Sequence, residues 1–245
     1  MMDRDISEEP QWSEEDSRMF LRLGDIGVPD RERQIEIIVD LIPASPQPQT
    51  ILELGSGEGR LAEAILRSHP DSQILGLDGS QEMRQAARRR LEIYEGRFET
   101  RGFELSSRSW RTPGQFHAVV SSLVIHHLDG AQKQALYRDL YEIIVPGGAL
   151  IIADLVQPAS QAGIGLAANG WDAAVRQRSL QMSGNADLYE QFQKFRWNIF
   201  HNPNPMDRPS SIFEHLTWLQ QAGFHQVDVY WMNAGHAIYG GMRPG

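Results

Sequence analysis

The 245-residue chain contains no cysteine, and this absence excludes several kinds of chemistry. Without thiols the protein has no disulfides, no thiolate metal ligands and no cysteine nucleophile. Long apolar runs are also missing, since no stretch approaches the roughly 20 apolar residues that span a bilayer. Residues 1–5 carry acids where a secretion signal carries bases, so we expect a cytoplasmic protein with no membrane partner.

Positive charge is scarce as well. The net charge is −9, and the segment from Asp3 to Asp16 holds seven acids and one base. Residues 1–16 are therefore predicted to form an acidic flexible tail, and residues 17–245 a single domain. The remainder of the chain is nearly neutral and lacks the broad basic surface that nucleic-acid binding requires, so we expect no nucleic-acid partner.

The most informative segment is a glycine-rich turn between an apolar strand and an amphipathic helix. Gly55, Gly57 and Gly59 follow a strand pattern at 50–54, and the helix N-terminus that follows attracts an anionic ligand group. A dinucleotide fingerprint needs its third glycine where Arg60 stands, which argues against NAD. The next strand ends on Asp78, an acid that can accept hydrogen bonds from both hydroxyls of a ribose.

The rest of the chain alternates strand and helix patterns, which predicts a doubly wound α/β sheet. Two strand patterns at the end of the chain have no helix between them and must pair antiparallel. The expected strands are 50–54, 73–78, 98–105, 116–122, 149–154, 226–231 and 237–240. The expected helices are 18–23 and 31–41, then 60–69, 81–94, 129–145, two within 157–209, and 211–223.

The pattern Glu53-x-Gly55-x-Gly57-x-Gly59, with Asp78 and the closing hairpin, resembles the class I methyltransferases that use S-adenosylmethionine (SAM). The resemblance covers about 48–157 and 210–241. It implies a mostly parallel seven-stranded sheet with a C-terminal antiparallel hairpin and SAM as the cofactor. It also divides the domain into N-terminal helices (17–45), a SAM-binding core (48–157), a helical cap insertion (157–209), and a C-terminal helix and hairpin (210–245).

The same resemblance implies roles for single residues. The three glycines would cradle the methionine end of SAM, Glu53 would support its amino group, and Asp78 would bind the ribose. Related enzymes place an acid after the third strand to bind adenine, where this chain has Glu104-Leu105-Ser106-Ser107. The expected cofactor residues are Glu53, Gly55, Gly57, Gly59, Asp78, Gly79, Met83, Leu105, Ser106 and Ser122.

Two adjacent histidines, His126 and His127, follow the fourth strand, at the edge of the sheet that borders a ligand crevice. Imidazole is suited to take a proton from a phenol, amine or carboxylic acid near pH 7. Adjacent residues usually point apart, so we expect His127 to face the methyl acceptor and His126 to pack or hydrogen-bond locally. A purely structural role for both histidines remains the alternative.

The insertion at 157–209 is rich in aromatic residues on two helical patterns. We expect most of them to pack, and we expect Trp171 and Trp197, with Asp154 after the fifth strand, to bind the acceptor. Catechol-type methyltransferases hold magnesium with several acidic or amide ligands at these strand ends. Only Asp154 is available here, so we expect no metal.

These features predict a methyltransferase that acts on an oxygen or nitrogen nucleophile of a small molecule. The lack of cysteine excludes pyrimidine C5 methylation, which needs a thiol adduct, and arsenite methylation, which needs thiolate ligands. Three alternatives remain open: a nucleic-acid or protein methyltransferase, an NAD(P) oxidoreductase, and a non-catalytic SAM-binding protein.

Overall fold

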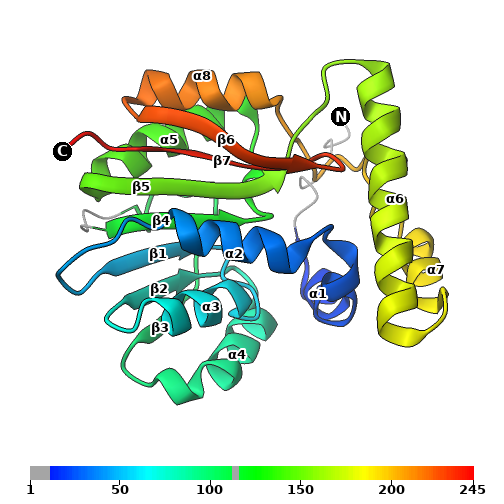
Figure 1. Ribbon diagram of the computed structural model, residues 1–245, viewed down its shortest axis with the longest axis horizontal. Helices are drawn as coiled ribbons and strands as arrows, with labels where there is room; N and C mark the ends of the chain where they lie inside the picture. Colours follow the sequence, from blue (N-terminus) through cyan, green and yellow to red (C-terminus); the bar gives the residue numbers. More distant parts are fainter. Residues whose placement is uncertain (1–11, 112–115) are drawn as a thin grey trace, which may run out of the picture.

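One mixed β-sheet forms the centre of the protein (Figure 1), in a computed structural model that describes residues 12–111 and 116–245. Within these residues the strands follow the order β3-β2-β1-β4-β5-β7-β6. Strands β3, β2, β1, β4 and β5 pair in parallel, whereas β7 pairs antiparallel with both β5 and β6. The bounds are β1 Thr50–Leu54, β2 Gln73–Leu77, β3 Phe98–Arg101, β4 Phe116–Ser122, β5 Ile144–Leu155, β6 His225–Asn233 and β7 His236–Met242. The predicted sheet and its closing hairpin are confirmed.

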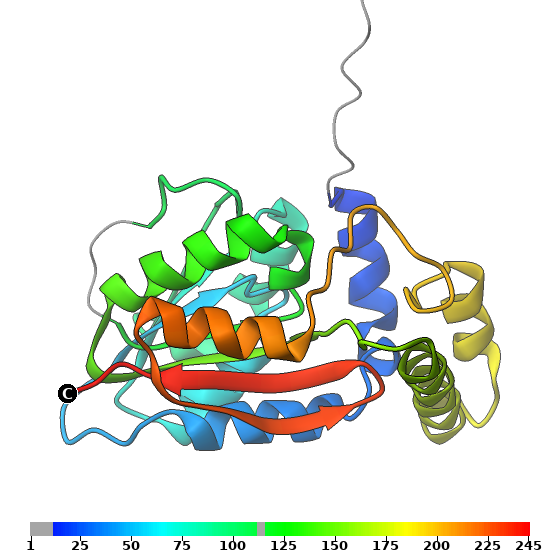
Figure 2. The ribbon, with the colours of Figure 1, turned by 90° about the horizontal axis from the view of Figure 1, so that it is seen from above.

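Helices cover both faces of the sheet because successive strand residues point to opposite sides. Figure 2 shows α5 (Gly130–Ile143) and α8 (Ile212–Ala222) on one side and α2 (Arg31–Leu41) on the other. Leu52 packs with α5 and α8 in one apolar cluster, and Ile51 packs with α2 and α3 (Arg60–Ser68) in the other. The strands are therefore buried on both faces, as their apolar sequences predict.

The N-terminal region differs from its prediction. Helix α1 spans Glu14–Gly27, because Ser13 and Asp16 form a capping box that starts the helix before the expected position. The helix also continues past Gly24, where a break was expected. Residues 12–16 are thus part of the folded domain, and the predicted tail boundary at residue 16 is wrong for them. Residues 1–11 of that tail lie outside the described residues.

Three other predicted boundaries shift. Strand β3 ends at Arg101, and α4 (Gln81–Arg90) is followed by a separate short 3-10 turn at Glu92–Tyr94. The turn Pro146-Gly147-Gly148 lies inside an irregular first part of β5, where the pairing with β4 shifts register. The sequence pattern shows only that the helix ends before these residues, because the bulged pairing depends on the neighbouring strand.

The insertion forms two helices, α6 (Gln161–Ser183) and α7 (Asp187–Lys194), as predicted. Both views show them beside α1, beyond the carboxyl ends of the parallel strands (Figures 1 and 2). Apolar residues of α1, α6 and α7 share one cluster that includes Leu23, Trp171 and Phe192. None of the helices in the described part of the chain combines the length and apolar character that a membrane crossing needs.

Candidate functional site

A cavity of about 500 Å³ opens at the carboxyl ends of β1, β2 and β4. Eight of the ten predicted cofactor residues line it, which brings together five separate segments of the chain. These eight are Gly55, Gly57, Asp78, Gly79, Met83, Leu105, Ser106 and Ser122. Among the described residues, the other lining residues are Trp12, Ser13, Glu14, Phe20, Ser80, Phe103, Glu104, Leu123, Val124, His127, Leu128, Gln132, Met206 and Arg208.

Asp78, the first residue after β2, is held rigidly at the cavity wall. Its Oδ2 accepts a hydrogen bond from the backbone N–H of Gly57 at 2.8 Å, and its Oδ1 accepts one from Ser80 at 2.9 Å. Burial raises the pKa of Asp78, whereas these two donors lower it. A carboxylate oxygen has two lone-pair sites, so each oxygen can still accept a hydroxyl. The arrangement suits two neighbouring hydroxyls, as on a ribose.

The glycines of the turn have different roles. Gly57 has φ +50°, and no heavy atom of the described residues lies within 4 Å of the position a Cβ would take. Gly59 is the N-cap of α3 with φ +80°, and a Cβ there would meet Leu91 at 2.8 Å and Ala87 at 3.2 Å. Gly57 therefore leaves space at the cavity, whereas Gly59 permits a close approach to α4 and does not line the cavity wall.

Glu53, on β1, is buried and also lies off the cavity wall. Its Oε2 has no hydrogen-bond partner in the described part of the chain. Burial raises the pKa of Glu53 well above its usual value, and the charge of Asp78 raises it further. A cation placed beside this carboxyl would offset both effects. The unpartnered oxygen therefore fits the implied contact with the amino group of SAM.

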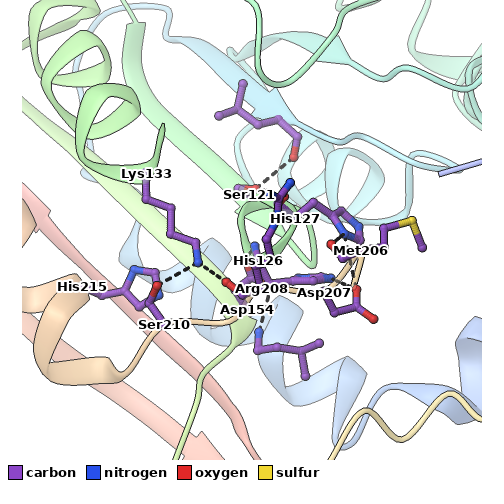
Figure 3. Close-up of polar contacts among 12 residues, drawn as sticks. Ser121, His126, His127, Lys133, Asp154, Met206, Asp207, Arg208, Ser210 and His215 are labelled. Atoms are coloured by element: carbon purple, nitrogen blue, oxygen red, sulfur yellow. Dashed lines mark hydrogen bonds and ion pairs between the residues drawn. The ribbon is translucent and has the colours of Figure 1, made fainter. Parts of the chain in front are cut away.

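The two histidines lie in a 3-10 turn after β4 and have different surroundings (Figure 3). Buried His126 places Nδ1 2.5 Å from Oδ1 of Asp154 and Nε2 3.4 Å from Oδ1 of Asp207. Burial lowers the pKa of His126, but the two carboxylates outweigh it and raise the value to about 9. His127 lies on the cavity wall, and burial followed by the charge of His126 lowers its pKa to about 4.

His127 is fixed through one ring nitrogen. Its Nδ1 lies 3.2 Å from the carbonyl oxygen of Met206 and 3.4 Å from Oδ1 of Asp207. The other nitrogen, Nε2, is thus the ring atom left for a ligand. Of the two histidines, only His127 lines the cavity. The expectation that the pair points apart is wrong, because the ring centroids lie 4.1 Å apart and both rings approach Oδ1 of Asp207.

The segment at 206–210 is tied across this histidine turn. The backbone N–H of Arg208 donates to the carbonyl of His126 at 2.8 Å, and Nη2 of Arg208 donates to the carbonyl of His127 at 3.0 Å. Lys133, on α5, donates from Nζ to the carbonyl of Arg208 and to Oγ of Ser210 (Figure 3). Burial lowers the pKa of Lys133 to about 8. These contacts fix Met206 and Asp207 beside the histidines.

The three residues expected to bind the acceptor lie elsewhere. Trp171 is buried, and its indole N–H donates to the carbonyl of Gly27 at 2.7 Å. Trp197 stacks with Phe20 at 6.0 Å between ring centroids, and Asp154 is occupied by His126. None of the three lines the cavity. This prediction fails because aromatic residues at helical spacing serve a core as readily as a pocket.

Helix α1 supplies a wall of the site that the sequence analysis missed. The Glu14 carboxylate accepts hydrogen bonds from Oγ of Ser80 at 2.6 Å and from the backbone N–H groups of Gln81 at 2.7 Å and Glu82 at 3.3 Å. The bond from Ser80 is the main cause of a lowered pKa of Glu14. Glu14 thereby caps α4 beside Asp78. The capping box around it was the available signal for an ordered start of α1.

Known proteins that are similar to this chain include methyltransferases. A family model described as "Methyltransferase domain" matches residues 52–150. A carboxy-S-adenosyl-L-methionine synthase from Klebsiella pneumoniae is 28% identical over 130 residues, or 52% of each chain. A trans-aconitate 2-methyltransferase from Yersinia pestis is 27% identical over 190 residues, which covers 72% of this chain and 68% of that one. The chain thus spans about half the length of the first of these relatives.

Solved structures share the fold. An O-methyltransferase family protein from Burkholderia thailandensis has a TM-score of 0.61 at 18% identity, over 87% of this chain and 57% of that one. An O-methyltransferase family 2 protein from Planctomyces limnophilus, in complex with apigenin, has a TM-score of 0.61 at 18% identity, over 95% and 62%. At these identities the likeness concerns the fold alone.

Proposed function

We propose that the chain is a class I S-adenosylmethionine-dependent methyltransferase that transfers a methyl group from SAM to an oxygen or nitrogen nucleophile of a small molecule. The observation that carries this proposal is the single cavity that holds both Asp78 and His127 on its wall. Cofactor residues from the glycine turn and a polar ring nitrogen after β4 therefore face the same space. Methyl transfer needs this proximity of cofactor and acceptor.

The residues that would hold SAM are those of the glycine turn and the following strand end. Gly57 leaves room for the methionine part, the unpartnered oxygen of Glu53 suits an ammonium group, and the fixed oxygens of Asp78 suit the ribose. Met83 and Leu105 supply apolar wall for the base. Bound SAM supplies an electrophilic methyl group on a sulfonium, so that the protein mainly has to position the acceptor.

His127 is the residue that we propose contacts the acceptor. Its Nδ1 is engaged by the carbonyl of Met206, which leaves Nε2 to accept a proton from a hydroxyl or amine of the acceptor. Burial keeps the pKa of His127 low, so the ring is neutral and able to accept a hydrogen bond at neutral pH. His126 is a positioning residue in this proposal, because its ring is buried and held by Asp154.

A small acceptor fits the cavity better than a macromolecule does. A volume of about 500 Å³ lies in the range of small-molecule pockets, which is roughly 300–1,000 Å³. Trp12 and Phe20, from the start of the described chain and α1, and Met206, near the end of the insertion, line the wall, which reduces access for a polymer. The names of the relatives, a trans-aconitate methyltransferase and an apigenin-bound O-methyltransferase family protein, support a small acceptor.

A transfer assay tests this proposal. The full chain is incubated with SAM and panels of phenols, carboxylic acids and amines, and the release of S-adenosylhomocysteine is followed. At least one panel member should give turnover, and His127→Gln should lower kcat by about 10²–10⁴-fold without changing SAM affinity. Turnover by His127→Gln at the wild-type rate would contradict the role of His127. Binding of NAD(P) in place of SAM would contradict the proposed function.

A further inference from the structure

Three side chains beside the cavity converge in the manner of metal ligands. One potential ligand atom from each of His126, His127 and Asp207 lies within 4.8 Å of the other two. The two histidines follow β4, whereas Asp207 comes from the last residues of the insertion (Figure 3). About 80 residues of chain therefore separate ligands that the fold brings to one point.

The distances favour a shared cation over direct ion pairs. Oδ1 of Asp207 lies 3.4 Å from Nε2 of His126 and 3.4 Å from Nδ1 of His127. A hydrogen-bonded imidazolium–carboxylate pair is usually closer, at about 2.7–2.9 Å. Two ligand atoms bound tetrahedrally to one zinc ion, at about 2.0–2.1 Å each, are separated by roughly 3.3–3.4 Å. Both distances match that second arrangement.

The surroundings of His126 add an independent observation. Its Nδ1 is held by Asp154 at 2.5 Å, and the backbone N–H of the same histidine donates to Asp154 at 2.8 Å. Metal-ligating histidines almost always donate their second ring N–H to a carboxylate or carbonyl in this way, which orients the free nitrogen. His126 and Asp154 are both buried, so the orientation of Nε2 toward Asp207 is built into the core.

We propose that His126, His127 and Asp207 bind one divalent transition-metal ion of the zinc class. Two imidazoles and one carboxylate suit Zn²⁺, Co²⁺ or Ni²⁺, whereas Mg²⁺ and Ca²⁺ prefer oxygen ligands alone. The site departs from the sequence-based expectation of no metal, which considered only acids at the strand ends. Asp207 has no sequence signal that links it to the histidines.

The metal site has a consequence for the adjoining cavity. A metal on Nδ1 of His127 would replace the contact of this nitrogen with the carbonyl of Met206. It would also require the ring proton to be on Nε2, so the ring would then donate a hydrogen bond to the acceptor and no longer accept its proton. Three protein ligands also leave a coordination position for a water or for an oxygen of the acceptor. Metal loading is therefore expected to change the chemistry at the acceptor end of the cavity and to leave SAM binding intact.

Metal titration tests the inference without a known acceptor. The full chain is stripped with EDTA, freed of chelator and titrated with Zn²⁺ against a chromophoric competitor, and with Co²⁺ by visible absorption. We expect one equivalent to bind, and Asp207→Asn to weaken binding at least tenfold. The matched control is Asp172→Asn, which alters another His–Asp pair of the insertion, with Oδ2 of Asp172 3.4 Å from Nε2 of His201. This control should bind like the wild type.

Three results would overturn the proposal: no stoichiometric binding by the wild type, equal affinity in Asp207→Asn, or an equal loss in Asp172→Asn. His127→Gln provides a second ligand substitution, with the same expected loss, if Asp207→Asn does not fold. SAM is titrated into the same samples by calorimetry. SAM binding without metal binding refutes the metal site alone, and metal binding without SAM binding refutes the proposed function alone.

Discussion

Replacing Glu14 with glutamine is expected to weaken both the fold and cofactor binding. The Glu14 carboxylate accepts three hydrogen bonds from the first turn of α4 and from Ser80, which precedes it. A carboxylate at a helix N-terminus contributes about 0.3–1 kcal/mol through the helix dipole. Hydrogen bonds to a charged group contribute roughly 1.5–3 kcal/mol. The neutral amide of glutamine can still form part of these bonds, and the partial exposure of Glu14 to solvent further reduces the energy that is lost.

These terms together give an expected loss of about 1 kcal/mol in Glu14→Gln, which corresponds to a factor of roughly five. Because Glu14 and Trp12 line the cavity, a loosened start of α1 should also weaken SAM binding by about fivefold. Urea unfolding measures the first effect, and calorimetry with SAM measures the second. Glu15→Gln is the matched control, since this neighbouring residue is exposed and carries the same charge.

Identical stability and SAM affinity in Glu14→Gln and Glu15→Gln would refute this reasoning. A truncation that starts at Ser17 should lose more than either variant, because it removes Trp12, Ser13 and Glu14 from the cavity wall. Retention of full SAM affinity in that truncation would restore the original prediction that the tail ends at residue 16.

Three further predictions follow from single residues. Gly57→Ala and Gly147→Ala both force alanine to positive φ, at +50° and +78°, and each variant should lose about 1 kcal/mol of stability in urea unfolding. Only Gly57→Ala should weaken SAM binding in calorimetry, and equal SAM affinity in both variants would contradict this. Because the pKa of Lys133 is lowered from 10.5 to about 8 in the folded protein, the unfolded chain binds more protons between these two pH values. The stability of the wild type relative to Lys133→Met should therefore rise with pH in that window, by up to about 1.4 kcal/mol per pH unit. Parallel curves of stability against pH for the two proteins would contradict this. Trp171→Phe removes the donor to Gly27 and should cost about 1–3 kcal/mol of stability with unchanged SAM affinity, and the reverse pattern would return Trp171 to the binding site.

The part of the site that was predictable from the sequence is the part built from contiguous chain. Gly57 and Asp78 follow the ends of neighbouring parallel strands, so the glycine spacing and the strand pattern together place them at one edge of the sheet. The remaining walls depend on long-range packing. Glu14 reaches Ser80 across 66 residues, and Asp207 reaches His126 from the end of an insertion whose direction no local pattern specifies.

The errors have physical causes too. Trp171 has the same helical spacing whether it fills a core or lines a pocket, and only the position of α6 against α1 decides between them. An acidic, proline-containing segment such as 1–16 is typical of a tail, yet the Ser13–Asp16 capping box makes its last turn helical. The polarity of the segment predicted a tail, whereas the capping box determines where α1 begins.

SAM binding by Asp78→Asn, measured by calorimetry, tests the central claim most directly. Asp78 is fixed by the N–H groups of Gly57 and Ser80 and faces the cavity that His127 also lines. With two ribose hydrogen bonds of roughly 1.5–3 kcal/mol each at stake, a folded Asp78→Asn protein should bind SAM at least a hundredfold more weakly than the wild type. The exposed Asp40→Asn variant should bind SAM normally. Wild-type affinity in folded Asp78→Asn would contradict the placement of the cofactor in this cavity.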